Sequence, residues 1–250
     1  MIEPFFVDFG YRLEGRKHPL RTIVDACFYV VDNGTKWRNL PNDFPPWKSV
    51  YHYFRLWSLS QLWEKISFTL VQDTRYAEGR ELSPSLTSID SQSQSAEPGI
   101  EGRGLDGGKK VNGRKRHIAV DVLGLILFCN CTPANTSDRV GGKKLVDQLN
   151  SKEKMPRLKK ILGDNAYKNL GINSEVPVSV EASERRAKSK KGFVPEAFRW
   201  AVERTFAWLN RQRRVARNYE KKPYHQESMN FIANIRICLK RLEKWMIIDS

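Results

Sequence analysis

The spacing of hydrophobic positions along this chain changes near residue 80, and the change separates two kinds of predicted element. Before residue 80, apolar residues recur every three to four positions in three stretches, which is the spacing of amphipathic helices. The first predicted helix runs from Arg21 to the Asn33-Gly34 stop, and the second begins near Trp47, after two prolines. The third begins after Ser60 as its cap. The residues before the first helix show no clear element.

After residue 80 the apolar stretches are short and lie between glycine-rich or charged segments, which is typical of strands. Residues 117–122 and 125–128 flank Gly124 and predict a hairpin, whose second strand is apolar on both faces and is therefore expected to be buried. The other predicted strands and helices are 86–91, 158–164 and 176–180, then 138–149, a helix that opens at Pro195, and 231–245, with a charged loop at 183–192. This order predicts a mixed α/β sheet flanked by helices.

The change of spacing also divides the chain into a helical N-terminal domain, 1–80, and an α/β domain, 81–250. Three short helices with basic, aromatic-rich connections are typical of a helix-turn-helix domain that binds DNA. A plain helical bundle packed on the next domain explains the same pattern equally well. The candidate phosphate contacts in this region are Lys36, Arg38, Lys48 and Arg55.

The formal net charge of +15 is concentrated in three segments, 109–116, 184–191 and 203–222. Such concentration indicates a surface for a polyanion, and nucleic acid is the leading partner. An anionic membrane is the competing partner, but no long basic amphipathic helix with an aromatic face stands out. The residues expected to contact DNA are Lys109, Lys110, Arg114, Lys115, Arg116, Arg199, Arg204, Arg211, Arg213 and Arg214.

The four cysteines are not spaced as zinc ligands, because no CxxC pair and no paired Cys/His spacing is present. The chain also has no signal peptide and no apolar run near 18 residues. We therefore expect a cytoplasmic protein with reduced thiols and no membrane partner.

Three acidic residues occupy positions that suit metal-dependent phosphoryl transfer. Asp90 and Asp164 each stand at the carboxyl end of a predicted strand, and Glu203 stands at the edge of the apolar stripe of a predicted helix. Carboxylate oxygens are the hard ligands that magnesium prefers, and two such ions can hold the attacking and leaving oxygens of a phosphodiester. Each acid also has a structural explanation: a turn cap for Asp90, a helix cap for Asp164 and an ion pair with a neighbouring arginine for Glu203.

Other polar residues near this predicted site have simpler interpretations. Asp121 stands at the predicted hairpin turn and is expected to be an occluded acid of that turn. Asp138 or the preceding Ser137 is expected to cap the helix 138–149. His117 is interpreted as a strand residue near phosphate.

Five blocks of sequence together resemble bacterial insertion-sequence transposases of the DDE class. These blocks are SIDS at 88–91, GKKVNGRKRH at 108–117, TPANTSDR at 132–139, GDNAY at 163–167 and VERTFAWL at 202–209. A further segment, 44–54, resembles the DNA-binding segment of the same family.

The resemblance implies an RNase H-like catalytic domain that binds element ends, nicks the DNA and joins the 3'-hydroxyls to target DNA. Asp90, Asp164 and Glu203 would be the three acids, which would hold two Mg²⁺ ions, with Mn²⁺ as a substitute. The implied partners are the terminal inverted repeats, target DNA and further copies of the chain in a homo-oligomer on DNA. The implied location is the bacterial cytoplasm, in association with the nucleoid.

The chain departs from the family's wider signature around the third acid. Arg199 and Glu203 match it, whereas the tyrosine position holds Glu196 and the lysine position holds Asn210. The segment before Arg21 is also shorter than the resemblance implies, as in a truncated copy. Two alternative hypotheses follow: a catalytically degenerate copy that binds element ends as a repressor, and a related nuclease that cuts without joining.

Overall fold

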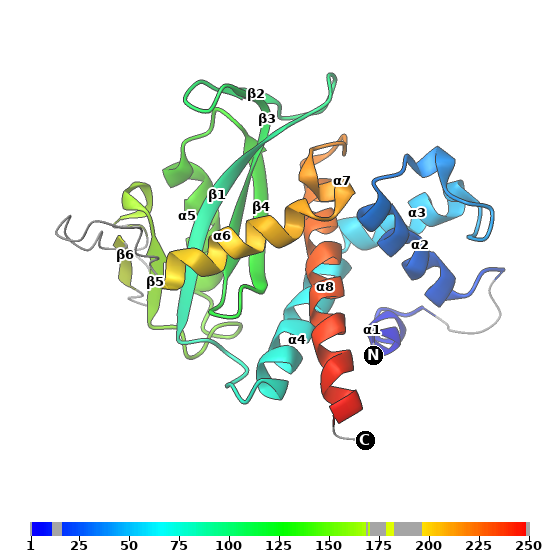
Figure 1. Ribbon diagram of the computed structural model, residues 1–250, viewed down its shortest axis with the longest axis horizontal. Helices are drawn as coiled ribbons and strands as arrows, with labels where there is room; N and C mark the ends of the chain where they lie inside the picture. The colour runs from blue at the N-terminus through cyan, green and yellow to red at the C-terminus, as the bar shows by residue number, and fades with distance from the viewer. Residues whose placement is uncertain (1, 12–16, 169, 171–178, 183–196, 249–250) are drawn as a thin grey trace.

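The structure is a computed structural model that describes residues 2–11, 17–168, 170, 179–182 and 197–248 (Figure 1). Its N-terminal part consists of α1 (Glu3–Asp8), α2 (Leu20–Asn33), the short 3-10 helix η1 (Trp37–Asn39), α3 (Trp47–Leu59) and α4 (Leu62–Ala77). The three predicted helices of this region are confirmed as α2, α3 and α4, whereas α1 was not predicted.

The predicted cap of α4 is wrong, because Ser60 ends α3 instead. The Ser60 hydroxyl donates back to the Trp57 carbonyl oxygen at 3.4 Å. The residue at the N-cap position of α4 is Gln61, whose φ of 58° is left-handed and whose side chain makes no capping hydrogen bond. The serine therefore closes one helix rather than opening the next.

The sheet joins antiparallel and parallel strands, as the predicted mixed α/β class requires. Its strands run in the order β4-β3-β1-β5-β6, and β2 pairs with the beginning of β3. β1 is antiparallel to β3 and parallel to β5. The bounds are β1 (Leu86–Ser95), β2 (Gly104–Asp106), β3 (Val111–Val120), β4 (Ile126–Pro133), β5 (Lys160–Gly163) and β6 (Ser179–Ala182).

The predicted hairpin is confirmed by the antiparallel pairing of β3 with β4 around Gly124, whose φ is +77°. Residues 125–129, from the last residue of the turn into β4, are all buried, as their apolar character predicted. β1 and β3 are longer than predicted, because the added parts are polar and do not show an apolar alternation. The predicted strand 176–180 is described only from Ser179, and the charged loop 183–192 and Pro195 lie outside the described residues.

Helices cover both faces of the sheet. α5 (Asp138–Leu149) lies against the face on which His117 points, since a Cβ added to Gly141 would lie 2.1 Å from that imidazole ring. α6 (Ala197–Asn210) lies against the opposite face, where the neighbouring Arg116 side chain bonds to Asn210. Successive strand residues point to opposite faces, so the two contacts assign the two helices to the two sides.

The last helix, α8 (Pro223–Ile248), covers the outer edge of β4. The Glu227 carboxylate accepts the Cys131 N–H at 2.8 Å, and Asn234 bonds to both the N–H and the carbonyl oxygen of Ile126. These bonds satisfy backbone groups that an edge strand would leave open to another chain. α8 begins earlier than the predicted 231–245 helix, because these polar inward-facing residues interrupt its apolar pattern. The short α7 (Arg213–Ala216) connects α6 to it.

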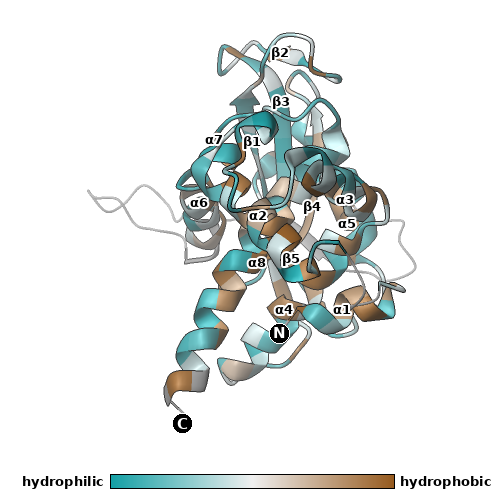
Figure 2. Ribbon diagram, turned by 90° about the vertical axis from the view of Figure 1, so that its right-hand side faces the viewer, coloured by the Kyte–Doolittle hydropathy of each residue, from teal (hydrophilic) through white to brown (hydrophobic). Residues whose placement is uncertain are grey.

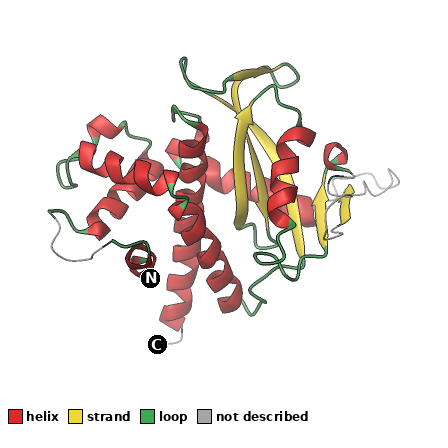
Figure 3. Ribbon diagram, turned by 180° about the vertical axis from the view of Figure 1, so that it is seen from behind, coloured by secondary structure: helices red, strands yellow, loops and turns green. Residues whose placement is uncertain are grey.

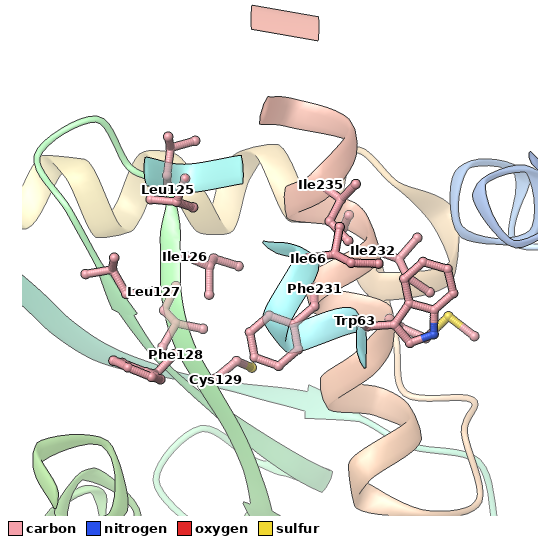
Figure 4. Packing of buried hydrophobic residues seen from close by; sticks show 14 of the residues in the cluster. Trp63, Ile66, Leu125, Ile126, Leu127, Phe128, Cys129, Phe231, Ile232 and Ile235 are labelled. Atoms are coloured by element: carbon pink, nitrogen blue, oxygen red, sulfur yellow. The ribbon is translucent and has the colours of Figure 1, made fainter. Parts of the chain in front are cut away.

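One continuous core joins the N-terminal helices to the sheet. Trp63 and Ile66 of α4 lie beside Ile232 and Ile235 of α8, which pack in turn toward Ile126 of β4 (Figure 4). Seen from behind, the remaining N-terminal helices lie on one side of α8 and the sheet on the other (Figure 3). This packing agrees with the helical-bundle interpretation, while a domain boundary near residue 80 and DNA binding by this region stay predictions.

Hydrophilic and hydrophobic residues follow one another along the helices, as the colouring of α8 shows (Figure 2). Within the described ranges, no helix combines the length and apolar character that spanning a bilayer requires.

Candidate functional site

Asp90 and Asp164 lie on neighbouring strands, at the level where β5 ends. Asp164 follows the last residue of β5 as predicted, whereas Asp90 is in the middle of β1, because polar residues continue that strand to Ser95 and the predicted strand end is wrong. β1 and β5 are parallel, and their last recorded pair is Ser88 with Leu162. Asp90 and Asp164 each come two residues after this pair, Asp90 within β1 and Asp164 directly after β5, so the register sets them side by side. The strands are in contact here, since a Cβ added to Gly163 would lie 3.1 Å from Ile89. Open α/β sheets bind ligands at such carboxyl ends.

Glu203 lies on the helix that covers the face of the sheet toward which Asp90 points. Asp90 pairs with Ile118, two residues from Arg116, and therefore shares its face. α6 packs against β1, β3 and β5 on that face. Glu203 itself is exposed, beside the buried residue Val202. The three acids are thus carried by three elements in mutual contact.

The described residues contain no group of three or more His, Cys, Asp or Glu side chains close enough to hold a metal ion. Asp164 Oδ1 accepts the Ala166 N–H at 2.9 Å and caps the 3-10 helix η2 (Asn165–Tyr167), as its structural explanation expected. Asp90 Oδ1 accepts the Ser91 N–H at 2.7 Å. The convergence of all three carboxylates therefore stays a prediction.

On the other face of β1 from Asp90 lies a polar network around Ser91 that the sequence analysis did not predict. The Ser91 hydroxyl donates to Asp138 at 2.7 Å, and the Lys115 ammonium pairs with the same carboxylate at 2.9 Å. Burial raises the pKa of Asp138, but these two partners outweigh it, so the pKa lies below its usual range. Ser137 rather than Asp138 caps α5, by accepting the Val140 N–H at 3.4 Å.

Tyr167, the last residue of η2, lies beside this network. Its side chain is fully buried against α5, where a Cβ added to Gly142 would lie 2.4 Å from the ring. Burial raises the pKa of Tyr167, and the negative charges of Asp90, Asp138 and Asp164 raise it further. Three carboxylates are therefore within electrostatic reach of one hydroxyl group. The spacing Asp-x-x-Tyr in the block at 163–167 was the available sequence signal.

Two family models match the chain. One, described as "Putative transposase of IS4/5 family (DUF4096)", matches residues 1–67, and the other, described as "Transposase DDE domain", matches residues 81–239. The chain belongs to the DDE-domain transposases. No curated protein and no solved structure matches it in the corresponding comparisons. The predicted family and the RNase H-like fold class are confirmed, and membership in this family implies that the transposase binds DNA.

The transposase buries part of the basic segment that was predicted to contact DNA. Arg114 is fully buried on β3, and its guanidinium bonds to a side-chain oxygen and to several backbone carbonyl oxygens. The oxygens belong to Glu101, Asn218, Glu220 and Lys221. Arg114 therefore ties two distant loops to the sheet, and its assignment to a DNA surface is corrected.

Arg116 is equally buried, and burial lowers the pKa of its guanidinium to about 10. It lies over the Phe206 ring, with 5.2 Å between the guanidinium carbon and the ring centroid. Its hydrogen-bond acceptors are oxygens of Gln92, Asn210, Val215 and Asn230. This arginine joins β3 to the helices of one face and offers no charge to DNA.

The predicted DNA contacts of Lys115 and Arg214 are also wrong, because both side chains are buried and paired within the protein. Lys115 is bound to Asp138, and Arg214 is buried in a 2.6 Å ion pair with Glu220. The remaining predicted contacts differ in exposure. Lys109, Lys110, Arg211 and Arg213 are exposed, Arg204 is half-buried, and the Arg199 side chain lies outside the described residues.

Proposed function

We propose that this transposase nicks DNA at the ends of its element and joins the 3'-hydroxyls to target DNA. The observation that carries the proposal is the parallel register of β1 and β5, which sets Asp90 beside Asp164 at the carboxyl end of β5. Glu203 is the third acid, carried on the helix that packs over both strands. Catalysis would depend on divalent cations, Mg²⁺ or Mn²⁺ in its place.

The donor set fits such cations, because carboxylate oxygens are hard ligands and the three acids lie on elements in contact. Asp90, Asp164 and Glu203 would hold the ions, which would activate the attacking oxygen and stabilise the leaving one. The protein's own contribution is orientation. The Ser91 N–H holds one oxygen of Asp90 at 2.7 Å, and the Ala166 N–H holds one oxygen of Asp164 at 2.9 Å.

The test is strand transfer of a duplex that carries the element end, in Mg²⁺, by wild type and Asp164→Asn. Loss of a metal-binding carboxylate should lower the rate by roughly a hundredfold or more, since even an outer partner of a metal ligand contributes 10–100-fold. Asp147→Asn is the matched control, because Asp147 is an exposed acid on α5, on the opposite face of the sheet. Equal rates for wild type and Asp164→Asn would refute the assignment.

The same assay separates the alternative functions. Binding of the element end without metal-dependent nicking would favour a repressor copy, and nicked but unjoined products would favour a nuclease. We also infer that the active form is a homo-oligomer assembled on DNA in the bacterial nucleoid. A catalytically inactive variant such as Asp164→Asn, mixed with wild type, would then lower the strand-transfer activity by more than its fraction of the mixture.

A further inference from the structure

A basic cleft lies between the end of α6, the middle of α8 and the end of α2. Its volume is about 320 Å³. Its lining residues are Asp32, Trp208, Arg211, Gln212, Arg236, Ile237, Lys240 and Arg241. Four of these residues are cationic and one is a carboxylate. Three of the four cations come from α8, a helix in which the sequence analysis placed no DNA contact.

The cleft keeps an excess of positive charge after its internal ion pair is counted. Arg236 pairs with Asp32 at 2.6 Å, which neutralises one cation. The hydrogen bond from Arg236 lowers the pKa of Asp32 most, and the charges of Lys240 and Arg213 lower it further. A single carboxylate thus faces several cations, so Arg211, Lys240 and Arg241 remain to be balanced by an external anion.

Two arginines are held together on one aromatic ring at the rim of the cleft. The guanidinium carbons of Arg204 and Arg241 lie 4.7 and 5.1 Å from the centroid of the Trp208 ring. Arg241 also donates to the Leu123 carbonyl oxygen at 3.2 Å, which restrains it. Burial and the charge of Arg241 both lower the pKa of Arg204. The repulsion between these like charges would be relieved by an anion bound beside them.

We propose that this cleft binds the phosphate backbone of DNA next to the three acids Asp90, Asp164 and Glu203. Arg211 directly follows α6 and comes eight residues after Glu203, and both residues are exposed; eight residues of helix rise by about 12 Å. At about 3.4 Å per nucleotide, that distance corresponds to three or four nucleotides of one strand. A strand whose reacting phosphate lies at Glu203 would therefore reach the cleft with a phosphate a few nucleotides away. The inference rests on the proposed function, because it takes DNA as the substrate.

The test measures the affinity of Lys240→Gln for the element-end duplex by fluorescence anisotropy, without metal, over a series of KCl concentrations. Lys240 is exposed, so its replacement should leave the melting temperature unchanged. Log K, the logarithm of the binding constant, falls with log salt, and each lost phosphate contact makes this slope shallower by about 0.9. That change corresponds to roughly eightfold weaker binding at 0.1 M salt. The double variant Arg211→Gln/Lys240→Gln should lose about twice that slope.

Lys152→Gln is the matched control. Lys152 is exposed and follows α5 at its far end from Asp138, hence away from Asp90. An affinity and slope for Lys240→Gln equal to those of Lys152→Gln would overturn the proposal. Because binding is measured without metal, it is separate from the chemistry. If Lys240→Gln keeps the wild-type slope while wild type performs strand transfer, the proposed DNA-binding cleft is refuted and the proposed reaction is not. If Lys240→Gln has a shallower slope but wild type performs no strand transfer, the proposed reaction is refuted and the cleft is not.

Discussion

Replacing Arg75 by methionine should destabilise the transposase by about 3–5 kcal/mol, which is the usual cost of removing one partner of a buried ion pair. Arg75 near the end of α4 donates to Asp121 at the β3–β4 turn, and both side chains are almost completely buried. The pair joins the N-terminal helices to the sheet. Methionine fills much of the same volume, so the loss of free energy should come from the charge rather than from a cavity.

The magnitude follows from what remains around Asp121. Its carboxylate still accepts the N–H groups of Leu123 and Leu125 at 3.0 and 2.9 Å, but its negative charge has lost its cation. The substitution also removes the 2.9 Å bond from Arg75 Nε to the Glu81 carbonyl oxygen. For a chain of this size, 1 kcal/mol corresponds to about 2–4 °C, so the melting temperature should fall by roughly 6–20 °C.

The loss should depend on pH with a definite sign. Burial raises the pKa of Asp121 in the folded protein, and removal of Arg75 should raise it further. A carboxyl whose folded-state pKa lies above its unfolded value binds more protons when folded, so its contribution to stability grows as the pH falls. The destabilisation of Arg75→Met should therefore be largest at neutral pH and smaller in mild acid.

Urea denaturation at neutral and mildly acidic pH tests this reasoning, with Asp121→Asn and Arg75→Met/Asp121→Asn completing a double-mutant cycle. The double variant should lose less free energy of unfolding than the sum of the single variants, because no unpaired charge is left buried. Additive losses, or a loss for Arg75→Met that is independent of pH, would refute the reasoning.

Two further predictions concern buried groups. Burial lowers the pKa of His225 to about 4, so the folded protein binds fewer protons and stability is lost as the pH falls from about 6.5 toward 4, by about 1.4 kcal/mol per pH unit. His225→Phe should remove this part of the pH dependence in urea denaturation, and an unchanged dependence would contradict the assignment. Gly141→Ala should cost about 1–3 kcal/mol, because the added Cβ would lie 2.1 Å from the His117 ring. Gly107→Ala, with nothing within 4 Å of its Cβ, is the control, and equal melting temperatures would show that the ring can move aside.

The sequence by itself determined the elements whose signals are local. The helical spacing predicted α2, α3 and α4, and the Gly124 turn between apolar stretches predicted the β3–β4 hairpin. These signals depend on neighbouring residues in the chain, so no long-range contact was needed to read them. The same holds for Asp164 at the end of β5 and for the sequence blocks that placed the chain among DDE-domain transposases.

Only the tertiary structure decided which basic residues are available to DNA. In sequence, Arg114 and Arg116 belong to a solvated basic run, yet both are buried because β3 is a central strand covered on both faces. Their acceptors include Asn218 and Val215, about 100 residues away in the chain. Conversely, three cations of α8 join Arg211 in one cleft. Charge can be counted from sequence, but whether it is bonded or exposed depends on contacts between distant segments.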